Sequence, residues 1–199
     1  MSIVEAIILG LVQGLTEFLP VSSSGHLVIL HEALGLKEAE LAFDVALHLG
    51  TLVALVSYFR KDLVQFATGL FKKNEQTRLA WLLILATIPA AIAGYLLESK
   101  AESTFRSARL VGVTMLIFGL IMLVAERYYK RRESHTEFGK ITRTQALIMG
   151  GAQAIALVPG VSRSGSTITS GLFAGLDRVA ATRFSFLLGI PITAGAILK

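Results

Sequence analysis

The stretch that decides the fold is Gln13–His26, which reads Gln-Gly-Leu-Thr-Glu-Phe-Leu-Pro-Val-Ser-Ser-Ser-Gly-His. It carries an acid, an amide, three adjacent serines and an imidazole, yet it lies within a strongly apolar part of the chain. Unpaired polar groups are costly in apolar surroundings, so a polar cluster at such a place indicates a functional site.

A second stretch far along the chain matches the first. It is Gln153–Thr167, which reads Gln-Ala-Ile-Ala-Leu-Val-Pro-Gly-Val-Ser-Arg-Ser-Gly-Ser-Thr. When Gln153 is aligned with Gln13, both stretches show Val-Ser-x-Ser-Gly at the same place, without a gap. We therefore expect the rest of the chain to be a scaffold that brings these two loops together.

The composition indicates an all-α integral membrane protein. Of the 199 residues, 53% are hydrophobic and 17% are charged, whereas soluble domains are about 45–50% apolar and about 25% charged. The absence of cysteine excludes a disulfide framework and thiolate chemistry. The net charge of +5 comes mostly from lysine and arginine in the links between apolar runs, which indicates membrane topology rather than a nucleic-acid partner.

The first 35 residues predict two short helices joined by a polar break. The first helix, over residues 2–19, ends before Pro20 because the residue before a proline avoids the helical conformation. Ser22 is suited to cap a second helix over residues 23–35. Neither helix reaches the roughly 20 apolar residues that cross a bilayer. Residues 2–35 therefore predict a re-entrant hairpin, whose tip is tolerated at membrane depth where it is buried in protein or wet.

Three membrane spans are predicted next, at 41–59, 79–97 and 110–125. The links after the first and third spans, residues 60–78 and 126–143, are the basic ones. Two crossings separate these links, so they lie on the same side, which the positive-inside rule makes cytoplasmic. The link around Lys100 then faces out. A basic patch that binds anionic lipid head groups would have the same placement.

The second hairpin is predicted at 144–175 and a further span at 182–198. Given this topology, the second hairpin enters from the cytoplasmic side and the first from the outer side, which is an inverted-topology repeat. The chain is then one transmembrane domain, 1–199, with repeat one at 1–126 and a partial repeat two at 144–199. The second repeat lacks counterparts of two spans, so we expect a fragment or truncated product with an exposed apolar groove.

The two serine-rich loops predict a phosphate or diphosphate site. Each loop opens a helix, and helix N-termini offer free N–H groups and a positive dipole end. Arg163 adds a charged fork that suits phosphate oxygens. The alternative for Arg163 is a loop arginine near the interface, or one paired to Glu17.

Further side chains share helix faces. Gln13 and Glu17, spaced i, i+4, could hold a divalent cation or could be a hydrogen-bonded pair that braces the hairpin. Ser23 and His26 place a hydroxyl nucleophile beside a possible base, although a histidine near a serine is also common by chance. Asp44 and His48 share a face of a span, where a supporting or structural role is favoured over a place in the cavity.

These motifs resemble those of the bacterial undecaprenyl-diphosphate phosphatase (bacitracin-resistance) family. The resemblance rests on Gln13-x-x-x-Glu17, on Pro-Val-Ser-Ser-Ser-Gly-His up to His26, and on the highly specific Pro-Gly-Val-Ser-Arg-Ser-Gly-Ser-Thr of 159–167. It also covers the order of the spans, and so essentially the whole chain. The family's acidic pair falls on Gln13 and Glu17, and the glutamine removes one carboxylate from the predicted metal pair.

The resemblance implies hydrolysis of undecaprenyl diphosphate to the monophosphate, which recycles the lipid carrier of cell-wall synthesis. The implied catalytic residues are Ser23, His26, Glu17 and Arg163, with Ser23 favoured as nucleophile and His26 as its helper. The residues expected to bind the substrate are Ser22, Ser24, Ser162, Ser164, Thr167 and Arg163.

The expected partners are a polyprenyl diphosphate lipid, the bilayer of the bacterial inner membrane and a divalent cation, Mg²⁺ or Ca²⁺, on Glu17 and Gln13. A homodimer is a further expectation. The rival function is a transporter or flippase of a polyprenyl phosphate lipid, which would use the same phosphate clamp without a nucleophile.

Overall fold

The computed structural model describes residues 1–36, 41–70, 72, 74–104 and 107–198, without the side chains of 41, 42 and 97–104. Lys73 and the side chain of Lys100 lie outside the described part. Throughout the described ranges the regular structure is helical, with one isolated bridge between Thr136 and Leu176. The predicted all-α fold is confirmed.

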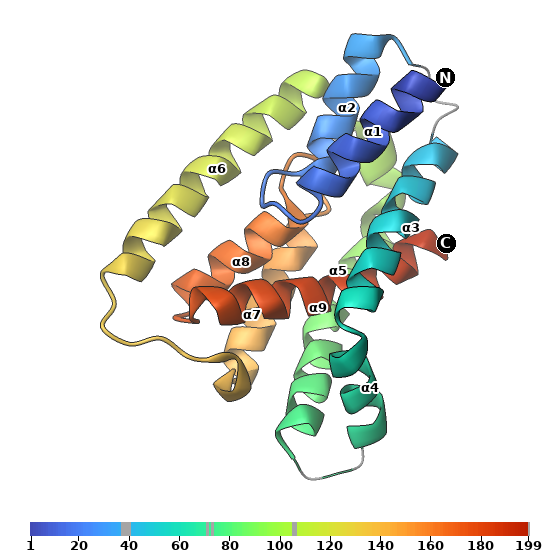
Figure 1. Ribbon diagram of the computed structural model, residues 1–199. Helices are drawn as coiled ribbons and strands as arrows, with labels where there is room; N and C mark the ends of the chain where they lie inside the picture. Colours follow the sequence, from blue (N-terminus) through green and yellow to red (C-terminus); the bar gives the residue numbers. More distant parts are fainter. Residues whose placement is uncertain (37–40, 71, 73, 105–106, 199) are drawn as a thin grey trace.

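The described chain forms a series of α-helices and one 3₁₀ turn (Figure 1). In chain order they are α1 (Ile3–Thr16), α2 (Ser23–Leu34), α3 (Leu41–Tyr58), α4 (Arg60–Gly69), α5 (Glu75–Thr104), α6 (Ala108–Lys130), η2 (Phe138–Lys140), α7 (Arg143–Ile155), α8 (Arg163–Phe173) and α9 (Arg178–Ile197). Among them α5, α6 and α9 are each long and apolar enough to cross a membrane, and α3 with α4 would be a fourth if the bent pair is one span.

The helices α1 and α2 form one hairpin and α7 and α8 form another. The two hairpins enter from opposite ends of the molecule, and their connecting loops lie side by side in the interior (Figure 1). There the Ser164 hydroxyl donates to the carbonyl oxygen of Leu19 at 3.2 Å. This arrangement agrees with two re-entrant hairpins, and the inverted symmetry that would relate them stays a prediction.

Each hairpin begins with the same kind of cap. Ser2 and Glu5 form a capping box at the start of α1, and Thr142 and Gln145 form one at the start of α7. In a capping box the side chain and backbone of the first and fourth residues satisfy each other's free groups. The predicted cap of α2 by Ser22 is confirmed, and Gly35 ends this helix at a φ of 65°.

Tight packing of α5 against α7 fixes the second hairpin. A Cβ built on Gly150 would lie 2.9 Å from the backbone carbonyl carbon of Ala86, so only glycine lets the two helices approach this closely. Met149 and Phe184 are fully buried in the same core. The large side chains of α3, α5, α7, α8 and α9 thus form a rigid frame around the loops.

The sequence did not predict α4. Residues 60–78 are basic and were expected to be a link, but Arg60–Gly69 is helical and turns by 70° from α3. Its polar side carries Arg60 and Lys61, while Phe66 is buried in the core. The packing of this apolar face explains why a polar segment folds as a helix. Similarly, α5 and α6 are longer than the predicted spans 79–97 and 110–125.

The outward face of α1 is apolar and exposed, with Ile3, Val4, Ile7, Leu11 and Leu15 on it. A groove of about 460 Å³ with almost entirely apolar walls also lies between α4, α5 and α9. In a membrane protein both surfaces can face lipid. The expectation of a truncated second repeat stays a prediction.

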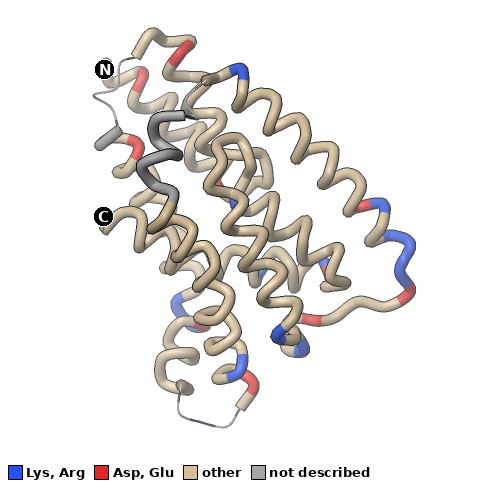
Figure 2. The backbone as a smooth tube through the Cα atoms, turned by 180° about the vertical axis from the view of Figure 1, so that it is seen from behind, with Lys and Arg blue, Asp and Glu red and all other residues tan. Residues whose placement is uncertain are grey.

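The two basic links lie at one end of the molecule, and the N-terminus and the start of α6 lie at the other (Figures 1 and 2). We expect single cysteines at positions 72 and 131 to be protected from an impermeant thiol reagent in intact cells, and Ser107→Cys to be labelled. Because the chain has no native cysteine, each label reports one position. Labelling at 72 and 131 but not at 107 would contradict the topology.

Candidate active site

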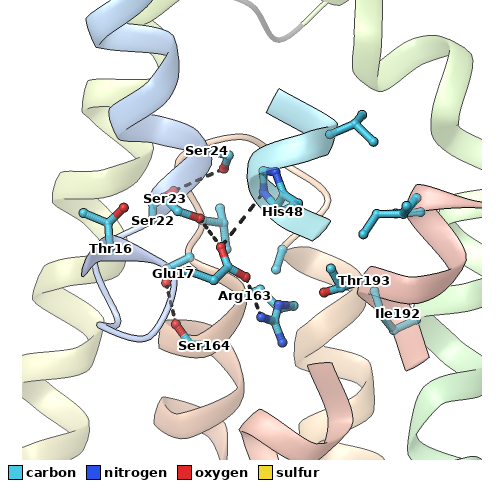
Figure 3. Close-up of a pocket in the computed structure, with 16 residues that line it drawn as sticks. Thr16, Glu17, Ser22, Ser23, Ser24, His48, Arg163, Ser164, Ile192 and Thr193 are labelled. Atoms are coloured by element: carbon cyan, nitrogen blue, oxygen red, sulfur yellow. Dashed lines mark hydrogen bonds and ion pairs between the residues drawn. The ribbon is translucent and has the colours of Figure 1, made fainter. Parts of the chain in front are cut away.

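A cavity of about 280 Å³ lies where the two hairpin loops meet α3 and α9 (Figure 3). Its walls combine hydroxyl and charged groups from both loops with apolar groups from the helices. The lining residues are Thr16, Glu17, Ser22, Ser23, Ser24, Val45, His48, Ala156, Val161, Ser162, Arg163, Ser164, Ile192, Thr193, Ala196 and Ile197.

Glu17 is the centre of this site. Its buried carboxylate accepts a hydrogen bond from Nη2 of Arg163 on Oε1, at 2.7 Å. On Oε2 it accepts one from the Ser23 hydroxyl at 2.5 Å and one from Nε2 of Gln13 at 3.1 Å. One acid therefore holds a cation from the second hairpin and a hydroxyl from the first. The pairing of Arg163 with Glu17, one of the readings weighed for this residue, is confirmed. Arg163 also lines the cavity, and its binding of a phosphate stays a prediction.

The two helix starts beside the cavity are built alike. The Ser22 hydroxyl accepts from the N–H of Gly25 at 3.2 Å, and the Ser162 hydroxyl accepts from the N–H of Gly165 at 3.0 Å. The first-turn N–H groups that these caps do not use have no acceptor within their own helix. Such N–H groups suit an anion, and the phosphate site that the sequence predicts stays a prediction.

The loops approach each other closely because small residues stand at the contact. A Cβ built on Gly165 would lie 3.2 Å from the carbonyl oxygen of Pro20 in the other loop. Ser22 has a φ of 65° and a ψ of 90°, and among the described residues no other non-glycine has a positive φ. Backbone strain of this kind is concentrated at functional sites, where the surrounding structure maintains it.

The structure separates the two candidate histidines. Nε2 of His48 lies 4.0 Å from Oε2 of Glu17, and the ring faces the cavity (Figure 3). His26 instead lines a second cavity of about 310 Å³ with Met115 and Phe118 of α6. Its Nδ1 lies 2.8 Å from the carbonyl oxygen of Ser22.

The sequence favoured a supporting or structural role for His48 over a place in the cavity, whereas the structure places its ring in the cavity wall. Its four-residue spacing from Asp44 placed it on one face of α3, but nothing in that pattern shows that this face meets the loops. Asp44 instead lies 3.5 Å from His31, and it does not line the cavity.

Thr167, which was expected to bind the substrate, does not line the cavity. It is fully buried between α8 and α9, where its hydroxyl lies 2.6 Å from that of Ser185 and donates to the carbonyl oxygen of Arg163 at 2.8 Å. Its contacts join the two helices just below Arg163.

The residues predicted to bind a cation do not form a site from protein groups alone. Gln13 presents its amide nitrogen to Glu17, whose two oxygens already accept from Arg163 and Ser23. Within the described ranges, no group of three or more His, Cys, Asp or Glu side chains could hold a metal ion. A cation would need most of its oxygen ligands from water or a bound phosphate.

Fold and site together define a multi-pass α-helical membrane protein with a cavity between two hairpin loops, lined by hydroxyl groups, a carboxylate and a guanidinium. Residues 6–199 match the family model described as bacitracin resistance protein BacA, and the chain belongs to this family.

Several relatives carry the name undecaprenyl-diphosphatase. That of Trichlorobacter lovleyi is 49% identical over all of this chain and 74% of the relative. That of Hahella chejuensis is 47% identical over 98% of this chain and 74% of the relative. That of Moorella thermoacetica is 46% identical over all of this chain and 76% of the relative.

The contacts of Thr167 predict a structural effect. In detergent, Thr167→Val should lower the free energy of unfolding by about 1–2 kcal/mol, because Ser185 loses its buried partner. Thr68→Val is the matched control, since this exposed hydroxyl donates only to its own helix at Val64, and it should change stability by less than about 0.5 kcal/mol. Equal effects of the two substitutions would show that the Thr167–Ser185 contact contributes nothing.

Proposed function

We propose that the cavity hydrolyses the terminal phosphate of undecaprenyl diphosphate and releases undecaprenyl phosphate and inorganic phosphate. The observation that carries this proposal is the hydrogen bond of 2.5 Å from the Ser23 hydroxyl to Glu17, whose other oxygen pairs with Arg163. A nucleophile, an acceptor for its proton and a cation for the phosphate thus meet at one point. The names of the relatives support the same substrate.

The diphosphate is recognised by groups from both hairpins. The first-turn N–H groups of α2 and α8 and the hydroxyl of Ser24 provide donors beside the cavity. Arg163 contributes its positive charge, and its side chain is 17% exposed. Phosphoryl transfer depends chiefly on such positioning and charge stabilisation.

In the first step the Ser23 oxygen attacks the terminal phosphorus in line and its proton passes to Oε2 of Glu17. The new O–P bond forms as the bond from this phosphorus to the bridging oxygen breaks, and undecaprenyl phosphate leaves with the electron pair. Water then attacks the phosphorus of the phosphoserine, the bond from phosphorus to the Ser23 oxygen breaks, and this oxygen takes the proton back from Glu17 as inorganic phosphate leaves. A helper role of His26 stays part of the proposal, as does a role of His48 beside Glu17.

A divalent cation, Mg²⁺ or Ca²⁺, is also proposed. It would be held by diphosphate oxygens together with Glu17, because Mg²⁺ is commonly bound by one or two carboxylates plus substrate phosphates. When bound, it neutralises charge on the diphosphate.

The apolar side of the cavity faces the lipid tail. Val45 of α3 and Ile192, Ala196 and Ile197 of α9 line this side. The isoprenoid chain can therefore remain in apolar surroundings while its head group reaches the loops.

We also propose that the protein works in the bacterial inner membrane as a homodimer. There its product recycles the lipid carrier of peptidoglycan synthesis, and its activity confers bacitracin resistance.

A transporter or flippase for a polyprenyl phosphate could use the same anion-binding groups. Transport alone does not require a serine hydroxyl held by a carboxylate at the phosphate site. The contact between Ser23 and Glu17 therefore favours the enzyme.

The purified protein should release phosphate from a C55 diphosphate, and EDTA should stop the release if the cation is needed.

The Arg163 variants test the role of the guanidinium. Arg163→Ala should abolish turnover. Arg163→Lys should lose on the order of 3 kcal/mol of transition-state stabilisation, because lysine keeps the charge but not the planar fork. Near-normal turnover of the lysine variant would show that charge alone matters, and an inactive wild-type protein would contradict the function.

The nucleophile can be identified by trapping the intermediate from terminally labelled substrate. We expect the label on Ser23, since its oxygen is held at Glu17 and lies in the first turn of α2. Ser24→Ala is the control and should still be labelled. An acid-labile, base-stable phosphoenzyme that survives in Ser23→Ala would indicate a phosphohistidine and contradict this assignment.

A further inference from the structure

Gly189 lies in α9, directly against the guanidinium group of Arg163. A Cβ built on Gly189 would overlap Nη1 of Arg163 and would lie 2.5 Å from its Cζ and 3.0 Å from its Nη2. Protein interiors are close-packed, so no side chain fits here unless the guanidinium moves. The Arg163 guanidinium occupies the space that a side chain at position 189 would fill.

The guanidinium is thus held from two sides. Its Nη2 donates to Glu17 at 2.7 Å, and its Nη1 is buried without a hydrogen-bond partner among the described residues. Gly189 is itself buried. The group lies between a carboxylate of the first hairpin and the backbone of α9, and its position depends on both.

Other glycines in helices do not share this surrounding. Gly195 lies in the same helix and Gly50 lies in α3, where it follows a leucine as Gly189 does, and a Cβ built on either meets nothing within 4 Å. A general preference for glycine in these helices therefore does not explain position 189. Its distinguishing feature is the contact with Arg163.

We propose that Gly189 is a positioning residue for the hydrolysis of the diphosphate. By lacking a side chain it lets the Arg163 guanidinium lie deep enough to reach Glu17 and to face the bound phosphate. The effect on catalysis rests on the proposed function, whereas the contact rests on geometry alone. A methyl group at position 189 would push the guanidinium out of this place, and a displacement on the order of 1 Å costs about 100-fold in rate.

The first test compares kcat and KM for a C55 diphosphate, normalised to folded protein. Gly189→Ala should lower kcat/KM by about 100-fold, and should raise KM because the displaced guanidinium no longer meets the phosphate. A loss of folded protein alone would lower apparent kcat and leave KM unchanged. Gly195→Ala and Gly50→Ala should stay within about twofold of the wild type. Wild-type kinetics of Gly189→Ala, or a loss in kcat with KM unchanged, would overturn the proposal.

The second test needs no substrate and measures thermal unfolding in detergent in a double-mutant cycle. Gly189→Ala should lower the Tm in the wild-type background. In the Arg163→Ala background the guanidinium is gone, so the same substitution should leave the Tm unchanged or raise it, because alanine favours the helix. An equal drop in both backgrounds would overturn the contact. If the wild-type protein released no phosphate, the proposed function would fail while this cycle still decided the contact.

Discussion

The structure depends on one buried ion pair, between Glu17 of the first hairpin and Arg163 of the second. These residues are 146 positions apart in the sequence. A buried charge without a partner is strongly unfavourable, so each hairpin tip requires the other. The same contact aims the carboxylate at Ser23, and the interaction that joins the two loops therefore also assembles the site. Stability and the geometry of the site are coupled here, because removing Arg163 takes the cation from the buried Glu17 carboxylate and removing Glu17 takes the acceptor from the Arg163 guanidinium.

Irregular backbone at membrane depth is tolerated only where protein or water satisfies its polar groups. In both loops a serine caps the following helix. The glycine three residues later leaves room for a close neighbour, which is Pro20 of the other loop at Gly165, and Val111 and Met115 of α6 at Gly25. The strained φ of Ser22 is maintained by these contacts. Polar groups that would be costly alone become a set of mutual donors and acceptors, with the remaining N–H groups facing the cavity.

The sequence predicted the helical fold, the two hairpins and the cap at Ser22 because these depend on local signals such as apolar length, Pro20 and serine before a helix. It missed α4, whose helix is stabilised by packing of Phe66 rather than by its own apolar length. It also favoured His26 over His48, because the choice depends on which helix face meets the loops. The sequence analysis does not single out Gly189, since its contact with Arg163 joins positions 26 residues apart and is visible only in the tertiary structure. Local patterns thus gave the elements, and tertiary contacts decided which side chains share the cavity.

The two matched loop motifs differ at the positions whose side chains carry the hydroxyl, the carboxylate and the guanidinium of the cavity. At the aligned places, Ser23 in the first loop corresponds to Arg163 in the second, so one loop supplies a hydroxyl and the other a cation. Gln13 donates to Glu17 four residues later, whereas Gln153 is followed at the same spacing by Leu157 and its buried amide has no partner within the described part of the chain. A symmetric pair of motifs would place like groups face to face, and two arginines or two acids there would repel each other. Divergence at these few positions gives two similar helix starts different side chains, a hydroxyl in one loop and a guanidinium in the other, while the shared serines and glycines keep the same backbone in both.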